Sequence, residues 1–454
     1  MSTPIAAIAT AQAPGAIGMV RLSGDGVTEI AAQIFHPAGG ADLTASKGYR
    51  AYFGTVCDRA GTFDNGIATV FRGPKSYTGE DVIEITCHGG LYMTRRLLRA
   101  ALDHGARLAQ PGEFTRRAFL NGKMSLTSAE AVMQLIGAQG NLAAGAARAA
   151  AEGALQRKIG AIRTQLTDAA AHLTAWADFP DEEVPEVTDA ELTERLSAAD
   201  GALRTLLNQF EAGRVLREGV ETVILGRPNV GKSTLMNVLS GCERSIVTAV
   251  PGTTRDVVEE SVQLGEIVLR LADTAGLRET DDPVERIGVD RARQRLETAG
   301  LVLAVFDGSS PLDDEDRRLL NAIQGRPAVA VINKGDLTEK IDVSYIQDKM
   351  IHVVKLSAAE NQGIDRLSEA VAQVLGTSSL QPDEGMLFTE RQRQAASAAS
   401  EAVTEALNAL YGGMTYDAIT VSVEAAIGAL TELTGESVSE SVVDAVFAQF
   451  CVGK

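Results

Sequence analysis

The sequence contains few of the residues that build disulfide scaffolds or metal clusters. It has five scattered histidines with no metal-ligand spacing, and its four cysteines form no Cys-x-x-Cys pair. These absences argue against a disulfide framework and a bound transition metal, and they favour a reducing cytoplasm as the compartment. The cysteines are Cys57, Cys87, Cys242 and Cys451.

Long apolar runs and an excess of basic residues are also missing. No apolar run reaches the length of about 18 residues that a membrane span needs, and the N-terminus lacks the basic opening of a signal peptide. Asp and Glu (60) outnumber Lys and Arg (42), which gives a net charge of −18. Because nonspecific nucleic-acid affinity comes from basic side chains that neutralise phosphates, a general phosphate-binding surface is not expected. RNA stays open as a substrate held by a local patch or through a partner.

Residues 1–118 are rich in glycine and in short runs that favour β-strands. One helix is expected over 95–102. The whole chain is long enough for about two to four domains, and this first segment is predicted to be a compact α+β domain. Its strands are expected at 5–8, 18–22, 51–56, 67–71 and 82–86.

Long helices are expected after residue 118. Thr127 and Glu130 have the spacing of a capping box, and residues 141–175 are dominated by alanine, the strongest helix former, without a proline. Pro180 ends this run. The next helix carries one apolar stripe, typical of the core of a helical bundle, which consists of Leu192, Leu196, Leu203, Leu206, Leu207 and Phe210.

A third pattern occupies residues 216–378. Apolar runs alternate there with helix-length segments, which is typical of βαβ units around a parallel sheet buried on both faces. The chain then returns to alanine-rich helices, so we predict an α/β domain inserted into a helical domain that comprises 119–215 and 379–454. The apolar runs lie at 220–225, 267–272, 301–306, 328–332 and 351–356, and the later helices at 390–410, 417–433 and 437–450.

A phosphate-binding loop (P-loop) is predicted at 226–233, where the sequence is GRPNVGKS. It follows an expected strand and precedes an expected helix, which is the context that such a loop requires. Gly226 and Gly231 allow backbone N–H groups to close around phosphate oxygens. Lys232 supplies a charge to the β- and γ-phosphates, and the hydroxyl of Ser233 is a Mg²⁺ ligand.

The run Asn333-Lys-Gly-Asp336 predicts selectivity for guanine. Asp336 can accept the two donors of the guanine Watson–Crick edge, which adenine lacks, so GTP is preferred over ATP. Asn333 and Lys334 hold the loop, and Ser357 with Ala358 closes over the base. A lone Asn-Lys-x-Asp run is a weak signal, but after a P-loop it is a strong one.

The region between these motifs departs from Ras-like GTPases. Asp273 in Asp-Thr-Ala-Gly is expected to hold Mg²⁺ through water, and the N–H of Gly276 to contact the γ-phosphate. Ras-like GTPases carry a water-positioning Gln after this glycine, whereas this chain has Leu277. Glu285 is a candidate replacement; the alternative is that it is one exposed acid of the acidic segment 279–285.

No arginine finger is evident in the sequence. Arg255 and Arg278 flank the expected switch segments, but either can equally be solvated or paired with an acid. Asn229, inside the P-loop, offers another source of positive charge, because its side-chain carbonyl can ligate a monovalent cation placed between the phosphates. Stabilisation of the charge that develops on the phosphates is the largest catalytic contribution in such enzymes.

With these residues in place, the chain resembles the MnmE (TrmE) family of tRNA modification GTPases from end to end. The family usually ends in Cys-Ile-Gly-Lys, so Val452 is a departure that we expect to be neutral. The further matching motifs are Tyr77-Thr-Gly-Glu-Asp-Val82, His88-Gly-Gly90, Pro111-Gly-Glu-Phe-Thr115, Ala118-Phe-Leu-Asn121, Asp178-Phe-Pro-Asp-Glu-Glu183 and Phe450-Cys-Val-Gly-Lys454.

The resemblance implies a cytoplasmic homodimer that forms a heterotetramer with MnmG, a flavoprotein that carries FAD. Together they add a (carboxymethyl)aminomethyl group at C5 of the wobble uridine of certain tRNAs. The first domain resembles a tetrahydrofolate-binding and dimerisation domain, with 5-formyl- or 5,10-methylene-tetrahydrofolate as the one-carbon source. The implied folate contacts are Arg21, Glu84, Lys123 and Lys454.

Two of these assignments have simpler alternatives. Arg21 and Glu84 also fit an ordinary pair on a strand surface. Cys451 matches the tail cysteine of the family and is a candidate for chemistry. A prenylation box is the superficial rival at this tail, but lysine is not an expected last residue.

The resemblance also implies K⁺-stimulated hydrolysis that is activated when two GTPase domains dimerise. Hydrolysis would then drive order–disorder changes that pass to the helical domain. The implied residues are Asn229, Thr248, Val250 and Thr253 for K⁺; Ser233 and Thr254 for Mg²⁺; Glu285, Lys232 and Gly276 for catalysis; and Asn229, Val230, Gly231, Lys232, Ser233, Thr234, Thr248, Ala249, Val250, Pro251, Gly252, Thr253, Thr254, Asp273, Thr274, Ala275, Gly276, Asn333, Lys334, Asp336, Ser357 and Ala358 for GTP.

Two other functions stay open on the sequence alone. A GTP-dependent ribosome or ribonucleoprotein assembly factor would carry out no covalent chemistry. A purely regulatory switch would hydrolyse GTP slowly, whatever the monovalent ion. The folate-like first domain and the Cys-Val-Gly-Lys tail favour the modification enzyme over both.

Overall fold

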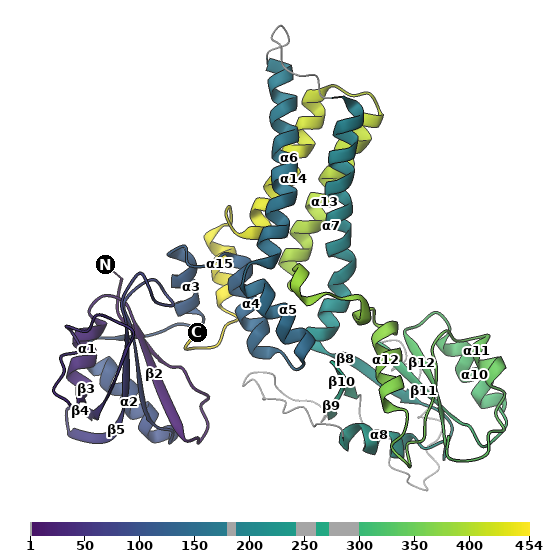
Figure 1. Ribbon diagram of the computed structural model, residues 1–454, viewed down its shortest axis with the longest axis horizontal. Coiled ribbons are helices and arrows are strands. Elements are labelled where there is room, and N and C mark those ends of the chain that lie inside the picture. The colour runs from purple at the N-terminus through teal and green to yellow at the C-terminus, as the bar shows by residue number, and fades with distance from the viewer. Residues whose placement is uncertain (1, 179–187, 242–259, 272–298) are drawn as a thin grey trace. The chain divides into compact units, whose positions relative to one another are not determined.

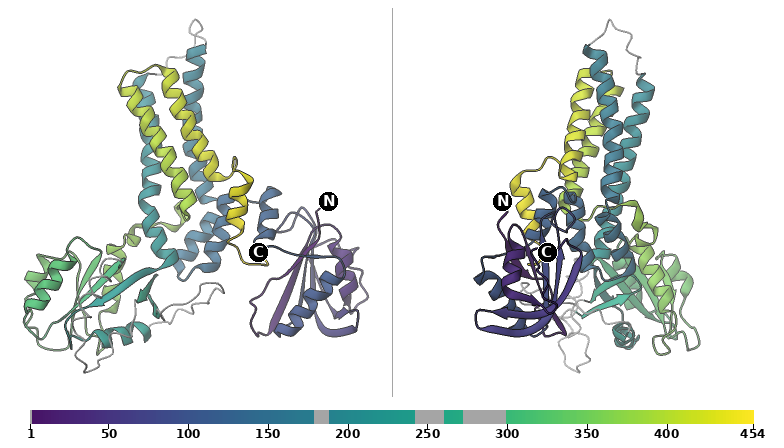
Figure 2. Two further views of the ribbon diagram at one scale, coloured as in Figure 1. Left: turned by 180° about the vertical axis from the view of Figure 1, so that it is seen from behind. Right: turned by 60° about the vertical axis from the view of Figure 1, so that its left-hand side comes forward.

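The computed structural model describes residues 2–178, 188–241, 260–271 and 299–454, and Figures 1 and 2 show it from three directions. Contacts between residues divide the chain into two compact units. One comprises residues 1–133 and 430–454, and the other comprises 134–429. Each unit contains one β-sheet.

The sheet of the N-terminal unit has the strand order β3-β4-β5-β6-β2-β1-β7. Its neighbouring strands are antiparallel, except that β1 and β7 are parallel. All five predicted strands are confirmed, and β3 and β7 are additional. The strands are β1 (Ile5–Ile8), β2 (Ile17–Ser23), β3 (Phe35–Pro37), β4 (Arg50–Asp58), β5 (Gly61–Phe71), β6 (Val82–His88) and β7 (Arg107–Leu108).

Two helices pack on one face of this sheet. They are α1 (Val27–Ile34) and α2 (Leu91–Asp103), and both contribute buried side chains to the same core as the strands. α2 contains the predicted helix over 95–102. α1 was not predicted, because it is short and begins after a glycine, Gly26, that makes no side-chain cap. The other face of the sheet carries exposed apolar side chains, among them Phe53 and Ile67, which lie opposite each other on β4 and β5.

The same unit contains a small helical core formed by residues far apart in sequence. Leu126 and Ala129 of α4 (Leu126–Gly137) pack with Val443 and Phe447 of α15 (Glu440–Phe447). The predicted capping box at Thr127 and Glu130 is wrong, because both residues lie inside α4. The hydroxyl of Ser125 instead accepts from the N–H of Ser128 at 3.2 Å. α3 (Glu113–Leu120) lies between the sheet and this core in sequence.

The second unit contains long helices that lie side by side in both figures. Among them α7 and α13 pack along each other, and the predicted stripe of α7 is buried except for Leu207, which is partly buried. The alanine-rich stretch 141–175 is not one helix. It breaks at Gly153, whose φ of 84° is left-handed. The helices are α5 (Asn141–Ala151), α6 (Ala154–Asp178), α7 (Asp189–Glu218), α13 (Glu390–Tyr411) and α14 (Tyr416–Thr434).

An α/β domain follows α7 in this unit and precedes α13. Its sheet has the order β13-β12-β11-β8-β10-β9 and is parallel except for the β9–β10 pair. β11 and β12 are buried at every residue, as predicted for a sheet covered on both faces. The predicted insertion is confirmed, because the helices on either side of the domain pack together.

β9, which forms a hairpin with β10, was not predicted from the sequence. The strands of the domain are β8 (Val220–Leu225), β9 (Glu260–Leu264), β10 (Ile267–Leu271), β11 (Leu301–Asp307), β12 (Ala328–Asn333) and β13 (Val353–Lys355). The helices among its described residues are α8 (Lys232–Gly241), α10 (Asp314–Ile323), α11 (Val343–Gln347) and α12 (Ile364–Val374).

Membrane-spanning helices, metal-binding clusters and disulfides are absent from the described residues. None of the helices in these ranges is long and apolar enough to cross a membrane, and no group of three or more metal-binding side chains occurs in them. Cys57 and Cys87 are buried free thiols, and burial raises the pKa of each. Cys451 is exposed, and Cys242 lies outside the described residues.

Candidate nucleotide site and candidate folate site

The predicted P-loop joins β8 to α8, and its two glycines are required by both conformation and packing. Gly226 and Gly231 have φ values of 151° and 95°, which residues with a Cβ rarely adopt. A Cβ on Gly226 would lie 2.3 Å from the carbonyl oxygen of Val305. On Gly231 it would lie 2.2 Å from the side-chain nitrogen of Asn333. Only glycine therefore fits at these two positions, where the loop backbone packs closely on Val305 and Asn333.

Lys232 is held inside this loop. Its Nζ donates to the carbonyl oxygens of Gly226 at 2.8 Å and Arg227 at 2.6 Å. Lys232 is also the first residue of α8, and the N-terminus of a helix favours an anion. Ser233 and Thr234 follow in the first turn with exposed side chains. The loop thus presents a lysine, a helix start and a hydroxyl oxygen, a set that fits a phosphate with Mg²⁺.

Asn333, at the end of β12, connects the P-loop to the predicted guanine loops. Its Nδ2 donates to the carbonyl oxygen of Val230 at 2.9 Å, and its Oδ1 accepts from the N–H of Ala358 at 3.0 Å. The side chain is buried. One amide therefore holds three predicted nucleotide-binding segments together.

The two charged residues of the guanine loop each have a defined partner. Asp336 Oδ1 accepts from the hydroxyl of Ser357 at 2.6 Å, and Ser357 is buried. Lys334 has a left-handed φ of 65°, and its Nζ lies 2.7 Å from Asp307 Oδ2. Burial acts to raise the pKa of Asp307, but hydrogen bonds from Lys334 and Ser309 outweigh it and hold the pKa at about 2.

Asp307 was not predicted from the sequence, although it directly follows the apolar run at 301–306. Asp307 could have been found as a carboxylate at the end of an expected buried parallel strand. Asn229, the predicted cation ligand in the P-loop, is exposed and has a φ of 63°. The predictions that lie outside the described residues are Thr248, Ala249, Val250, Pro251, Gly252, Thr253, Thr254, Asp273, Thr274, Ala275, Gly276, Leu277 and Glu285, together with Arg255 and Arg278.

Three of the four predicted folate residues lie together in the N-terminal unit. Arg21 and Glu84 are opposite each other on β2 and β6, with Nη2 of Arg21 2.8 Å from Oε1 of Glu84. Nη1 of Arg21 also donates to the carbonyl oxygen of Gly453 at 3.2 Å. Burial lowers the pKa of the adjacent Lys454, and the charge of Arg21 lowers it further.

Aromatic rings flank the same guanidinium. Its carbon lies 5.7 Å from the ring centroid of Tyr77 and 5.8 Å from that of Phe114. A paired arginine and carboxylate beside two rings fit a planar, polar heterocycle. Neither ring was predicted as a site residue, although both belong to motifs noted in the sequence. The fourth predicted residue, Lys123, has a different partner: its Nζ donates to the carbonyl oxygen of Pro74 at 3.0 Å.

The C-terminal tail is held against the start of α3. The N–H of Phe114 donates to the carbonyl oxygen of Lys454 at 3.2 Å, and that of Gly112 to the carbonyl oxygen of Cys451 at 3.4 Å. Gly112 has a left-handed φ of 66°, and a Cβ there would lie 2.6 Å from the carbonyl oxygen of Phe447. These contacts place the last residue of the chain beside Arg21.

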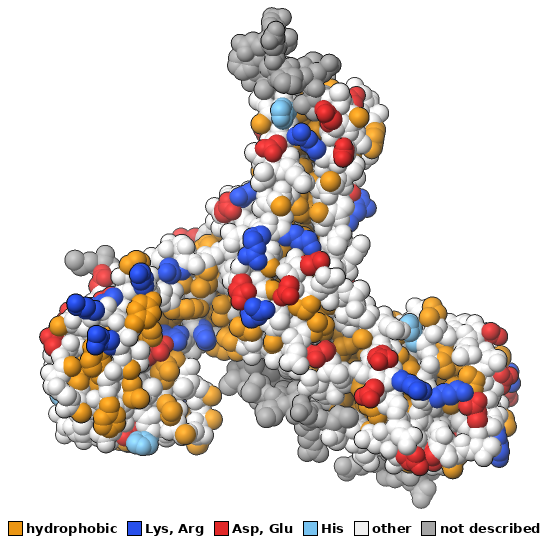
Figure 3. Space-filling model, in the orientation of Figure 1, with side chains coloured by type: hydrophobic (Ala, Val, Ile, Leu, Met, Phe, Trp, Pro, Cys, Tyr) orange, Lys and Arg blue, Asp and Glu red, His pale blue; other side chains and the backbone are white. Residues whose placement is uncertain are grey.

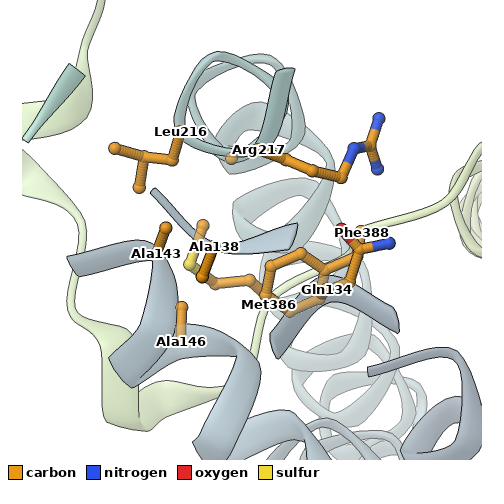
Figure 4. Close-up of a pocket in the computed structure, with 9 residues that line it drawn as sticks. Gln134, Ala138, Ala143, Ala146, Leu216, Arg217, Met386 and Phe388 are labelled. Atoms are coloured by element: carbon orange, nitrogen blue, oxygen red, sulfur yellow. The ribbon is translucent and has the colours of Figure 1, made fainter. Parts of the chain in front are cut away.

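The second unit also has a small pocket, which Figure 4 shows between α5, α7 and the segment before α13. Its lining is apolar apart from Gln134 and Arg217, and includes Ala143, Leu216 and Met386. None of the predicted site residues lines it.

Comparison with known proteins shows to which family the chain belongs. A family profile described as GTP-binding protein TrmE N-terminus matches residues 4–123, and one described as MnmE helical domain matches residues 126–451. The protein "tRNA modification GTPase MnmE" of Symbiobacterium thermophilum is 44% identical over 454 residues, which are 99% of each chain. The chain belongs to the MnmE family.

Other MnmE relatives agree over the same length. Those of Heliobacterium modesticaldum and Bacillus subtilis are 42% and 40% identical, again over 99% of each chain. The helical-domain match encloses the α/β domain, as its predicted insertion requires. Among solved structures, the FeoB G-domain of Methanococcus jannaschii is 26% identical, with a TM-score of 0.26, and covers 35% of this chain and 98% of that one. The resemblance to the MnmE family inferred from the sequence is confirmed.

Proposed function

We propose that this chain hydrolyses GTP and couples the hydrolysis to modification of the wobble uridine of tRNA. Membership of the MnmE family supports the reaction class. The structural observation that carries the nucleotide assignment is the buried amide of Asn333, which ties the P-loop to both guanine loops.

The described residues have distinct tasks in this proposal. Lys232 leaves the loop carbonyls for the β- and γ-phosphates, whose charge its ammonium balances. Backbone N–H groups at Val230 and Gly231 bind phosphate oxygens. Asp336 accepts from the base, and Ser357 fixes the orientation of its carboxylate by donating to one oxygen.

The remaining nucleotide assignments rest on sequence. Ser233 and Thr254 would hold Mg²⁺, and Asn229, Thr248, Val250 and Thr253 would hold K⁺. Each cation would supply positive charge to the phosphates. Glu285 orients the attacking water, in place of the absent Gln, and Gly276 contacts the γ-phosphate.

Replacement of K⁺ by Na⁺ is expected to lower the rate of GTP hydrolysis at least about tenfold, because loss of one charge stabiliser commonly costs about that much or more. The measurement is phosphate release at constant ionic strength in K⁺, Na⁺ and choline salts. The smaller ion is expected to match choline. Equal rates in K⁺ and Na⁺ would remove Asn229 from its assigned role.

For the N-terminal domain, residues 1–118, we propose binding of a reduced folate and formation of a homodimer. Arg21, Glu84 and Lys454 bind the polar edge and charge of the folate, and Lys123 contacts it from the neighbouring loop. The folate supplies the one-carbon unit. The exposed apolar residues of the open sheet face, such as Phe53 and Ile67, fit contact with a second copy. MnmG is the proposed partner that brings FAD.

Arg21→Met is expected to lower the affinity for 5-formyl-tetrahydrofolate about tenfold or more, because a charge-assisted hydrogen bond is lost and Glu84 loses its partner. Arg96→Met is the matched control. Arg96 pairs with Asp58 at 2.7 Å and lies over the ring of Phe63, but it is not a predicted site residue. Calorimetric titration of both variants checks the expectation. Equal affinities would return Arg21 and Glu84 to an ordinary surface pair.

Figure 3 bears on how tRNA is held. On the face shown, acidic and basic side chains are interspersed over the helices of the second unit. Arginines of the helices in this unit are paired with acids, as Arg148 is with Glu152 and Arg204 with Asp200. The described residues form no continuous basic surface on this face. We propose that tRNA is held by a local patch or through the partner protein.

Mass spectrometry of wobble nucleosides, with and without the gene, tests the function directly. Loss of the C5 modification on deletion is the expected result, and restoration by the wild-type gene is the control. The alternative, a GTP-dependent assembly factor, predicts unchanged wobble uridines and altered ribosome profiles. Unchanged wobble nucleosides in the deletion strain would contradict the proposed role in tRNA modification.

A further inference from the structure

The P-loop arginine, Arg227, has two carboxylate partners outside the loop. Its Nε donates to Asp316 Oδ1 at 3.0 Å, and its Nη1 to Asp313 Oδ2 at 2.6 Å. Both acids belong to the start of α10, where Asp313 is the N-cap residue and Asp316 lies three positions later. The side chain of Asp316 is completely buried.

Each of the four carboxylate oxygens of Asp313 and Asp316 accepts a hydrogen bond. Asp313 Oδ1 accepts from the N–H of Asp316 at 3.0 Å, and Asp316 Oδ2 from the N–H of Asp313 at 3.3 Å, which is a reciprocal capping box. The two oxygens that remain receive Arg227. The helix start is therefore a preformed receptor with the fork geometry that suits a guanidinium.

The energetic balance of this pair differs between its two members: burial opposes the charge on Arg227, but Asp316 and Asp313 outweigh it and raise the pKa of Arg227. Burial raises the pKa of Asp316 in spite of the neighbouring guanidinium, so the folded protein holds the charged carboxylate at a cost. Buried ion pairs commonly contribute little or nothing to the free energy of folding relative to neutral replacements. The capping box of Asp313 and Asp316 would form without an arginine. We therefore consider which part of the site the ion pair of Arg227 and Asp316 holds in place.

What it positions is the lysine-holding part of the P-loop. The carbonyl oxygen of Arg227 accepts from Nζ of Lys232 at 2.6 Å. The strand that precedes this helix start, β11, ends at Asp307, which holds Lys334 of the guanine loop. Asp307, Asp313 and Asp316, called the acidic bracket here, thus hold the phosphate end and the base end of the site from one segment.

We infer that the acidic bracket positions the nucleotide site, and that Arg227 and Asp316 set the affinity for guanine nucleotides without touching the nucleotide. The inference rests on the proposed GTP binding. Arg227 is a positioning residue whose fork keeps the P-loop backbone in its binding conformation, so that the nucleotide need not order it.

The test uses the full-length chain and a fluorescent GDP analogue. Arg227→Met is expected to raise Kd for GDP about tenfold, and Asp316→Asn about fivefold, because contacting residues of one network couple at this level. Arg227→Lys, which keeps the charge but not the fork, falls between wild type and Arg227→Met. Arg318→Met, an exposed arginine on α10, is the matched control and binds as wild type.

Two further readouts separate positioning from general damage to the fold. The melting temperature of nucleotide-free Asp316→Asn is expected to fall, because one of the two donors, Arg227 Nε or the N–H of Asp313, would face the new amide N–H₂. The loss of affinity is therefore measured well below that temperature, where the variant is fully folded. In hydrolysis, KM rises while kcat at saturating GTP stays within about threefold of wild type. The double variant Arg227→Met/Asp316→Asn is no weaker than Arg227→Met alone.

The outcomes are distinct. Wild-type affinity in Arg227→Met, or losses that add in the double variant, overturn the positioning role and leave the GTPase proposal standing. A fall in melting temperature that accounts for the whole loss of binding also overturns it. Absence of GDP binding by the wild-type chain instead overturns the proposed function, and the positioning role with it.

Discussion

Asp336→Asn is expected to lower the affinity for GTP by about 10²-fold or more and to create a preference for xanthosine triphosphate. A site built to hydrogen-bond a polar group rejects an analogue that leaves the buried groups unpaired by large factors, up to about 10⁴–10⁵. In this variant an amide N–H₂ would face the guanine N2 donors. Xanthine carries a carbonyl at that position and can accept from it.

The contact with Ser357 determines which way the side-chain amide of the Asp336→Asn variant is oriented. The Ser357 hydroxyl donates to Asp336 Oδ1 at 2.6 Å, so the carbonyl oxygen of an asparagine will occupy that position and its nitrogen will point to the base. Competition between GTP and xanthosine triphosphate for the fluorescent GDP analogue is the measurement. Asp348→Asn, an exposed aspartate of the same domain, is the control. Undiminished GTP preference would contradict the assigned base contact.

Glu285→Ala is expected to lower kcat by about 10²-fold or more while the affinity for GTP is unchanged, because positioning of the attacking water contributes in the transition state alone. The chain has Leu277 where a water-positioning Gln stands in Ras-like GTPases. Some other group must therefore orient the water, and Glu285 is the proposed one.

Glu279→Ala supplies the control for this experiment, since Glu279 belongs to the same acidic segment. Single-turnover hydrolysis in K⁺ salts, with GDP affinity measured in parallel, separates catalysis from binding. A variant at Glu285 that turns over like wild type, or like Glu279→Ala, would identify Glu285 as a solvated acid.

The fold was predictable wherever a local signal was strong. The longer strands of both sheets and the helices of the bundle followed from apolar periodicity, which depends on neighbouring residues alone, whereas β3, β7 and β9 did not. Errors fell where one residue decides a boundary. The alanine-rich stretch breaks at Gly153, and α4 is capped at Ser125 rather than Thr127. β9 escaped prediction, since a short antiparallel strand owes its place to pairing with β10.

By itself, the sequence determined the family and the chemical inventory: the P-loop glycines, Lys232, the guanine run and the departure at Leu277. Each of these signals is a short run whose function depends on backbone conformation or on adjacent residue types. Such information is local, and it is visible without a three-dimensional structure.

Only the tertiary structure decided which of these residues act together. Arg21 meets the carbonyl oxygen of Gly453, 432 positions away, and Asn333 joins Val230 to Ala358. Arg227 finds Asp316 across 89 positions. These contacts arise where the chain returns to a strand end or a helix start, and sequence spacing carries no record of that path. The nucleotide-binding residues can thus be identified from the sequence. The contact of the P-loop with α10 and the position of the C-terminal tail beside Arg21 are decided by tertiary packing.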